Sequence, residues 1–256
     1  MPRKMLTAAA ILLAAYAGLC ALLFFNQRSL LYFPQPRAPI AGATTMALPT
    51  EAGPVLVTVR ARSGPNALVY FGGNAEDVTY NLPGFAAAFP DHAIYLLHYR
   101  GYGGSAGTPT QAALFADAVA LFDKVRTDHG NIVAIGRSLG SGVAVHLASV
   151  RPVSRLVLVT PYNSIRDLAA QQFPYVPVRW LMRDRYESWK YAQQVTVPTL
   201  LVMAEHDEVI PRASTEGLHR YFRAGTATLG VISGAGHNTL SGSPEYMQLL
   251  RMGAGY

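Results

Sequence analysis

Three residues of the types needed for nucleophilic hydrolysis follow one another along the chain. Ser138 is the centre of the run GRSLG, which fits the pattern Gly-x-Ser-x-Gly. Asp207 follows the apolar run TLLVMA, and His237 lies in the segment SGAGHN. A serine hydroxyl becomes a good nucleophile when a histidine takes its proton and an acid orients that histidine. The residue types and their order therefore predict a catalytic triad of Ser138, Asp207 and His237.

The sequence around Ser138 predicts the sharp strand-to-helix turn that exposes such a serine. Ile132–Ile135 is apolar and of strand type, and Leu139–Ala148 has the composition of a helix. Gly136 and Gly140 flank the turn, where larger side chains would clash with the neighbouring backbone. This context matters because the chain has 23 glycines, so a chance match to the pentapeptide alone proves little.

Acyl-transfer chemistry also needs donors for the negative charge that develops on the carbonyl oxygen. The backbone N–H of Leu139, directly after the nucleophile, is one expected donor. The segment YFGGNAED follows another apolar run, and its two glycines allow close approach. We expect the N–H of Asn74 to be the second donor. A plain β-turn at Gly72-Gly73-Asn74 is the alternative.

Other residues near these motifs invite different interpretations. HYRGYGGSA formally resembles a dinucleotide-binding fingerprint, but the following helix starts several residues too late, so we interpret it as a Gly-rich turn beside the pocket. Glu205 is an alternative to Asp207 as the triad acid. Otherwise Glu205, His206 and Glu208 are interpreted as solvated surface residues. Their spacing is not that of a metal site.

The elements that would position these residues alternate between strand and helix. Most strand candidates are continuous apolar runs, as expected for strands buried on both faces. The candidates are Val55–Arg60, Ala67–Phe71, Ala93–His98, Ile132–Ile135, Leu156–Thr160, Thr199–Ala204 and Ala227–Ser233. Ala112–Val125 places apolar residues at helical spacing. The pattern predicts an α/β fold with a mostly parallel central sheet and helices on both faces.

Residues 162–197 interrupt this alternation. The segment is rich in aromatic residues, proline and arginine and contains no strand candidate. It is interpreted as a short lid insertion, and one crossover helix with a long loop is the alternative. Its cluster of basic and aromatic residues could contact anionic lipid heads or an acidic substrate, or could be a solvated helix with an apolar underside. The cluster comprises Arg179, Trp180, Arg183, Arg185, Tyr186 and Trp189.

The N-terminal segment predicts a membrane anchor. Met5–Phe25 has no charged residue and follows Arg3 and Lys4. As a helix it is long enough to cross the hydrocarbon core, and no small-residue cleavage site follows. We therefore expect an uncleaved signal anchor at residues 1–27 and a hydrolase-type domain at residues 28–256. The basic start favours an inside N-terminus, which would place the domain on the exported side.

Composition narrows the class of protein. Half of the residues are hydrophobic and 14% are charged, which indicates one folded domain and not a disordered chain. The formal net charge is +6, but the arginines are scattered, so nucleic-acid binding is not expected. The single cysteine, Cys20, excludes an internal disulfide.

With these motifs in place, the sequence resembles the α/β-hydrolase superfamily, and within it the single-anchor serine hydrolases that include depalmitoylase-like and serine-aminopeptidase-like members. The likeness rests on RSLLYFP, YFGGNAED, YRGYGGSAGTPT, GRSLGSGVA, TPYNSI, EHDEVIP and GAGHN. It implies an eight-stranded sheet, the triad roles given above, and no metal or organic cofactor. Relatives often have His-Gly where this chain has Gly72-Gly73, and the lid is the least family-like region.

The sequence thus predicts a membrane-anchored serine hydrolase that cleaves carboxylic esters or thioesters. Its partners would be a small-molecule or lipid-like acyl substrate and the membrane. An aminopeptidase-like peptidase is the alternative enzyme, although the bases of the lid outnumber its acids. A non-catalytic, membrane-tethered scaffold is the alternative from another class. Acyl-chain length and oligomeric state stay open.

Overall fold

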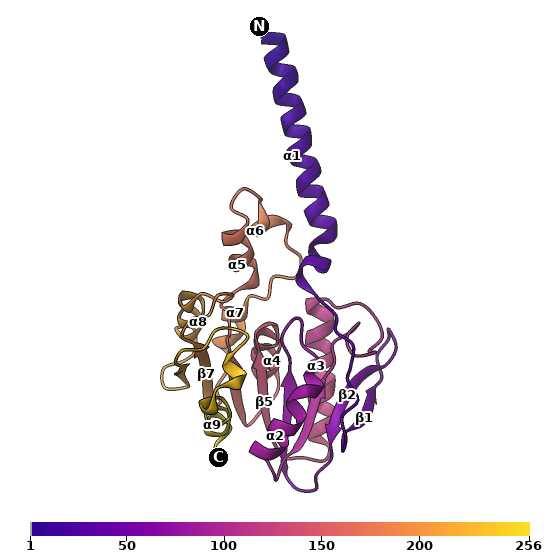
Figure 1. The fold of residues 1–256 in the computed structure, drawn as a ribbon, viewed down its shortest axis with the longest axis vertical. Coiled ribbons are helices and arrows are strands. Elements are labelled where there is room, and N and C mark those ends of the chain that lie inside the picture. Colours follow the sequence, from indigo (N-terminus) through magenta and orange to yellow (C-terminus); the bar gives the residue numbers. More distant parts are fainter. Residues whose placement is uncertain (1) are drawn as a thin grey trace.

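An eight-stranded sheet forms the centre of the computed structural model, which describes residues 2–256 (Figure 1). The strand order is β1-β2-β4-β3-β5-β6-β7-β8. The first three strands in this order pair antiparallel, and every later pair is parallel. The strands are β1 (Thr44–Leu48), β2 (Val55–Arg60), β3 (Asn66–Phe71), β4 (Ala93–Leu97), β5 (Asn131–Arg137), β6 (Arg155–Val159), β7 (Thr199–Ala204) and β8 (Ala227–Ile232).

The seven strands expected from apolar runs are all present, with bounds that differ by two residues at most. The hydrophobic pattern did not indicate β1. This strand lies at the edge of the sheet, and Leu48 is its only buried residue. An edge strand with solvated side chains carries little hydrophobic signal, which explains the omission. The eighth strand was implied by the family resemblance alone.

Helices cover both faces of the sheet, and the buried side chains form two clusters, one on each face. Helices α3 and α4 pack on one face, through residues such as Leu121 and Leu147. Helices α2 and α9 pack on the other, through Phe85 and Leu250. These helices are α2 (Leu82–Ala88), α3 (Gln111–Arg126), α4 (Leu139–Val150) and α9 (Pro244–Ala254); α8 (Arg212–His219) and the 3₁₀ turns η1 (Val78–Asn81) and η2 (Leu240–Gly242) complete this part of the chain.

The start of α3 decides the interpretation of the Gly-rich segment before it. Thr110 caps the helix, its side-chain oxygen accepting a hydrogen bond from the Ala113 N–H at 3.1 Å. Gly101, Gly103 and Gly107 all have positive φ, so the segment is a turn and does not open a helix. This confirms that HYRGYGGSA is a glycine-rich turn and lacks the strand-to-helix geometry of a dinucleotide site.

The N-terminal segment is a single helix, α1 (Pro2–Leu31), that projects away from the sheet (Figure 1). Its residues Arg3–Leu31 are long and apolar enough to cross a membrane. The expected division of the chain after residue 27 falls inside this helix, because α1 continues without a break for another turn. The helix ends before the proline-containing connector that starts at Pro34.

The segment expected to form a lid, residues 162–197, contains three short helices between β6 and β7. They are α5 (Ile165–Gln172), α6 (Val178–Leu181) and α7 (Ser188–Ala192). A single antiparallel bridge joins Ser164 to Glu187 and closes the base of the segment. Helices α5 and α6 lie beside the lower half of α1 (Figure 1). Tyr186, assigned from sequence to the basic and aromatic cluster, is instead completely buried.

Candidate active site

Four of the predicted site residues lie in loops at one edge of the sheet. Asn74 follows β3, Ser138 follows β5, Asp207 follows β7 and His237 follows β8. These four strands are parallel, so their carboxyl ends meet at the same edge. This edge is where open α/β sheets collect the side chains that bind ligands.

The side chains of Ser138, His237 and Asp207 form a continuous hydrogen-bonded chain. His237 Nε2 lies 3.0 Å from Ser138 Oγ. On the other side of the ring, His237 Nδ1 lies 2.9 Å and 3.0 Å from the two carboxylate oxygens of Asp207. The side chains of His237 and Asp207 are each 7% exposed. The arrangement therefore has a hydroxyl, a base in contact with it, and a shielded acid that orients the base.

The turn that carries Ser138 is strained and is held by its neighbours. Ser138 has φ 48° and ψ −117°, a backbone conformation that residues with side chains rarely adopt. Its N–H donates to the carbonyl of Val159 at 2.9 Å. Its carbonyl accepts from both the N–H and the hydroxyl of Ser141, at 2.9 Å and 2.7 Å. These contacts keep the serine at the tip of the turn, pointing toward His237.

The two flanking glycines are required by the close packing of the turn. A Cβ at Gly136 would overlap the carbonyl of Gly140, and a Cβ at Gly140 would overlap the carbonyl of Phe71. Backbone atoms cannot move aside as a flexible side chain could. The prediction that side chains here would clash with the backbone is therefore confirmed.

The two expected oxyanion donors lie on either side of the serine. Leu139 is the first residue of α4. The loop after β3 runs beside the turn: a Cβ added at Gly73 would lie 3.7 Å from Ser138 Cβ. Within residues 2–256 neither the Leu139 N–H nor the Asn74 N–H has an acceptor in the protein. The Asn74 side chain is occupied elsewhere: its Oδ1 accepts hydrogen bonds from the Phe33 N–H and the Tyr102 hydroxyl, both at 3.0 Å.

Comparison with known proteins agrees with this geometry. Residues 66–188 match the family described as alpha/beta hydrolase fold. An uncharacterised protein of Mycobacterium tuberculosis is 32% identical over 254 residues, covering 92% of this chain and 89% of its own. The chain belongs to the α/β-hydrolase superfamily.

Two further likenesses extend the comparison within this superfamily. The alpha/beta hydrolase domain-containing protein aho-3 of Caenorhabditis elegans is 31% identical over 72% of this chain, which spans 56% of the nematode protein. The fold is also similar to that of an esterase of Pyrococcus furiosus, with a TM-score of 0.67 at 15% identity, covering 87% of this chain and 95% of the esterase. Superfamily membership supports hydrolytic activity for the chain.

Asp207 of this candidate site is held in its ionised form. Burial by itself would raise the pKa of Asp207, but hydrogen bonds outweigh that effect and lower the pKa below its ordinary value. The His237 ring and the backbone N–H groups of Val209 and Ile210 donate these bonds; the N–H distances to Asp207 Oδ1 are 2.9 Å and 2.7 Å. A charged Asp207 would stabilise positive charge on the His237 ring.

Two acids interpreted as solvated surface residues instead hold the histidine loop. Glu208 Oε2 accepts the backbone N–H of His237 at 2.9 Å, and Glu205 Oε2 accepts the N–H of Gly234 at 2.8 Å. The surface interpretation was therefore incomplete: both side chains reach solvent, but each also fixes one end of the loop. The run EHDE around Asp207 was the available signal, because it holds two acids besides Asp207, and a triad needs one.

Sequence reasoning missed an ion pair that joins the β3 loop to the histidine loop. Glu76 Oε2 accepts the Gly73 N–H at 2.5 Å and lies 3.4 Å from Arg137 Nη1. Arg137 Nη2 donates to the carbonyl of His237 at 3.3 Å. Burial alone would lower the pKa of the Arg137 guanidinium, but the Glu76 carboxylate raises it, so the guanidinium stays charged. Glu76 lies in YFGGNAED and Arg137 in GRSLG, but neither motif has a pattern that predicts the ion pair.

Proposed function

We propose that the chain is a serine hydrolase that cleaves carboxylic ester or thioester bonds through an acyl-enzyme intermediate. The observation that carries this proposal is the hydrogen-bonded chain from Ser138 Oγ through His237 to Asp207, with distances of 3.0 Å and 2.9 Å. A hydroxyl in contact with an oriented imidazole is the arrangement that acyl transfer needs. The strained backbone at Ser138 supports a site built for chemistry.

In the proposed reaction, Ser138 Oγ attacks the acyl carbon while His237 Nε2 takes the hydroxyl proton. The N–H groups of Leu139 and Asn74 stabilise the oxyanion. When the tetrahedral intermediate collapses, the bond to the leaving alcohol or thiol breaks and His237 returns the proton to it. Water then attacks the acyl-enzyme with His237 as base, which releases the acid and restores the Ser138 hydroxyl.

The lid argues against the peptidase alternative. An aminopeptidase needs a free carboxylate to bind the amine of its substrate. Asp184 of the lid is paired with Arg28 at 3.0 Å, and Glu187 is paired with Arg166 at 2.9 Å and with Lys190 at 2.6 Å. Both carboxylates are therefore already paired with basic side chains. We rank ester and thioester substrates above amino-acyl amides.

We also propose that α1 anchors the chain in a membrane, with the catalytic domain on the exported side. The length and apolar composition of Arg3–Leu31 support the anchor. The side rests on Arg3 and Lys4 before the apolar run. Accessibility of the domain to protease in intact cells and in lysed cells tests this side.

The test of the hydrolase proposal is labelling of the full chain in detergent with a fluorophosphonate probe. The wild type should label, Ser138→Ala should not, and Ser149→Ala should label like the wild type. Ser149 is the matched control because it lies at the far end of α4, where, within residues 2–256, its hydroxyl donates to the His146 carbonyl alone. Hydrolysis of p-nitrophenyl esters and acyl thioesters then defines the substrate. A folded wild-type chain that never labels would support the non-catalytic scaffold instead.

A further inference from the structure

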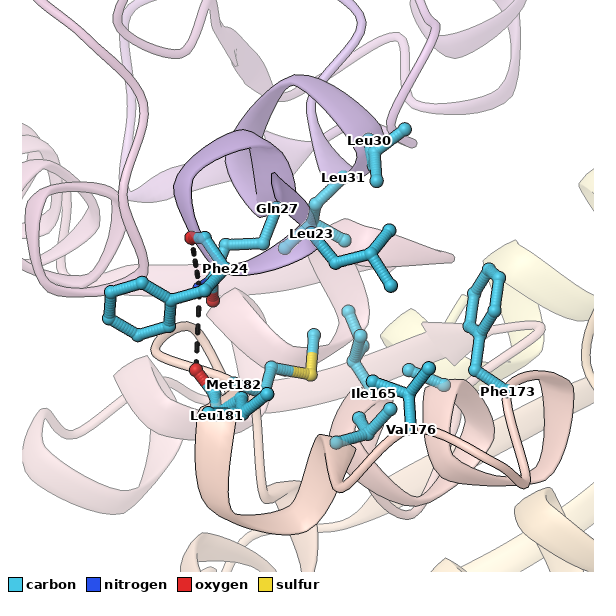
Figure 2. A pocket seen from close by; sticks show the side chains of 12 residues that line it. Leu23, Phe24, Gln27, Leu30, Leu31, Ile165, Phe173, Val176, Leu181 and Met182 are labelled. Atoms are coloured by element: carbon cyan, nitrogen blue, oxygen red, sulfur yellow. Dashed lines mark hydrogen bonds between the residues drawn. The ribbon is translucent and has the colours of Figure 1, made fainter. Parts of the chain in front are cut away.

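An apolar cleft separates the anchor helix from the lid. It has a volume of about 150 Å³ and lies between the last turns of α1 and helices α5 and α6 (Figure 2). Leu23, Phe24, Leu30 and other apolar side chains line it from both sides, and Gln27 is the polar side chain in its wall. Gln27 Nε2 donates to the carbonyl of Leu181 at 3.3 Å, and Gln27 Oε1 accepts the N–H of Arg183 at 2.7 Å. The lid is thus clamped to α1.

A second contact places the tip of the lid much farther along α1. The hydroxyl of Tyr16 donates to the carbonyl of Tyr175 at 2.9 Å. Tyr16 lies near the middle of the uncharged run Met5–Phe25. At 1.5 Å per residue, the part of this run from Met5 to Tyr16 is about 17 Å long. The hydrocarbon core of a bilayer is about 30 Å thick, so this part alone cannot cross it. If α1 spans the core, the lid tip must lie inside it.

The surface of the lid tip, residues 173–182, has the chemistry of a lipid-facing segment. Trp180 and Tyr175 are 85% and 87% exposed, and Phe173 is also exposed. Arg179 is the one charged residue of the tip, and it is paired with Asp167 at 2.8 Å. Exposed aromatic side chains of this number are unusual on a surface that faces water, and Trp and Tyr are typical of the membrane interface.

The backbone of the tip is also suited to an apolar surrounding. Two prolines, Pro174 and Pro177, have no N–H to satisfy. Five further N–H groups of the tip donate to carbonyls within the lid, namely those of Val176, Val178, Trp180, Leu181 and Met182. The Tyr175 carbonyl is taken by Tyr16. Burying these groups in lipid therefore leaves few unmade hydrogen bonds, which would otherwise each cost several kcal/mol (about 2–7).

Apart from the paired Arg179, the charged residues of the lid begin at the level of the last turns of α1 and mark where the lipid would end. The Arg183 guanidinium lies 4.2 Å from the centre of the Phe24 ring. Arg28 Nε lies 3.0 Å from Asp184 Oδ2. Arginine side chains at this level can contact lipid head groups, with apolar residues of the tip beyond them.

We propose that the lid tip, residues 173–182, is immersed in the lipid leaflet beside α1, and that lipid acyl chains cover Trp180 and the mouth of the α1–lid cleft. The inference rests on the proposed membrane anchor and does not depend on the hydrolase chemistry. It makes the lid a second membrane contact of the chain and places the cleft in continuity with the hydrocarbon core.

The two tryptophans of the chain, Trp180 and Trp189, allow a direct test. The full chain is reconstituted into phosphatidylcholine vesicles whose acyl chains are brominated near their middle, and tryptophan fluorescence is measured. Trp189 lies at the base of the lid, where its ring packs against Tyr221. We expect brominated lipid to quench Trp189→Phe, which retains Trp180, several-fold more strongly than Trp180→Phe, which retains Trp189. Aqueous acrylamide should show the opposite order.

Each other outcome overturns the inference in a distinguishable way. Vesicles that float without the chain would contradict the anchor and the immersion together. A chain that floats with Trp180 quenched by acrylamide and not by brominated lipid would contradict immersion alone. Trp180 shielded from both quenchers would indicate that protein, and not lipid, covers the tip.

If Trp189→Phe does not fold, the difference between wild type and Trp180→Phe reports on Trp180. Fluorophosphonate labelling of the same vesicles tests the hydrolase proposal separately.

Discussion

The side chain of Asn74 accepts a hydrogen bond from the backbone N–H of Phe33, which joins the loop beside the nucleophile to the segment that leaves the anchor helix. The Tyr102 hydroxyl donates to the same oxygen and also accepts from the Phe33 N–H, at 2.9 Å. Three parts of the chain far apart in sequence meet at this point. The position of the Asn74 N–H thus depends on the connector that follows α1.

Removal of the Asn74 side chain should therefore slow the reaction although that side chain does not touch the reacting atoms. We expect Asn74→Ala to lower kcat by about 10- to 100-fold, less than or equal to the loss of a whole oxyanion donor, with a small change in KM. Tyr102→Phe should have a weaker effect in the same direction. Steady-state kinetics on an activated ester measure both. An unchanged kcat for Asn74→Ala would show that the loop keeps its position without these bonds.

The loop that carries His237 should depend on Glu208. In Glu208→Ala the His237 N–H loses its acceptor, so we expect kcat to fall by about fivefold, the size of one lost hydrogen bond. Glu208→Gln keeps an acceptor oxygen and should retain most of the activity. If Gln and Ala have equal effects, charge and not the hydrogen bond is what Glu208 contributes.

The lowered pKa of Asp207 predicts a definite dependence of stability on pH. Burial opposes ionisation, but the His237 ring and two backbone N–H groups favour it more strongly. A carboxyl group whose pKa is depressed by folding stabilises the protein above its unfolded pKa, and this stabilisation is lost as the pH falls through the folded pKa. Wild type should therefore melt above Asp207→Asn at about pH 7, and the difference should shrink below about pH 4. A difference in Tm that is constant from about pH 7 to pH 3 would contradict the depressed pKa.

The Glu76–Arg137 pair should be costly to break from one side. Their side chains are 12% and 16% exposed, so Glu76→Gln leaves a largely buried guanidinium without its carboxylate. We expect a loss of about 3 kcal/mol in the free energy of unfolding, measured in urea. Combining Glu76→Gln with Arg137→Met removes both charges and should recover part of the loss. A double variant less stable than the single one would show that Arg137 stabilises the fold by other contacts.

The packing around the nucleophile predicts opposite outcomes for two glycines. In Gly140→Ala the new methyl group meets the backbone carbonyl of Phe71, so the variant should lose fluorophosphonate labelling and melt at a lower temperature. Gly130→Ala adds a methyl group in open space and should melt at the wild-type temperature or slightly above. Differential scanning fluorimetry distinguishes them. Equal melting temperatures would mean that the turn can relax around a side chain.

The sequence was informative where one pattern reports on one local requirement. Continuous apolar runs predicted the buried strands, and the glycines around Ser138 predicted a turn too tight for side chains. The order of Ser138, Asp207 and His237, read with the strand ends, indicated which loops would meet. Each of these features involves several neighbouring residues, so it can be recognised from the sequence alone.

What the sequence did not predict depends on contacts between distant segments. Glu76 and Arg137 are far apart in the chain, and no spacing rule pairs them. Glu208 looks like any exposed acid until the His237 loop is placed beside it. The burial of Tyr186 follows from its packing against Phe115, with ring centres 5.6 Å apart, and from its bond to the Tyr32 hydroxyl. Such contacts arise from the tertiary fold, and local composition does not encode them.

Helix α1 is joined to the α/β domain by contacts on both sides of its end. Its last turn is fixed to the lid through Arg28 and Gln27, and the Tyr32 hydroxyl bonds the Tyr186 hydroxyl at 2.9 Å directly after it. In a bilayer this rigid connection would give the serine a fixed height and tilt. Substrates would then be selected by how far their scissile bond projects from the membrane plane. Turnover would follow their surface density in the same membrane, and bulk concentration would matter little.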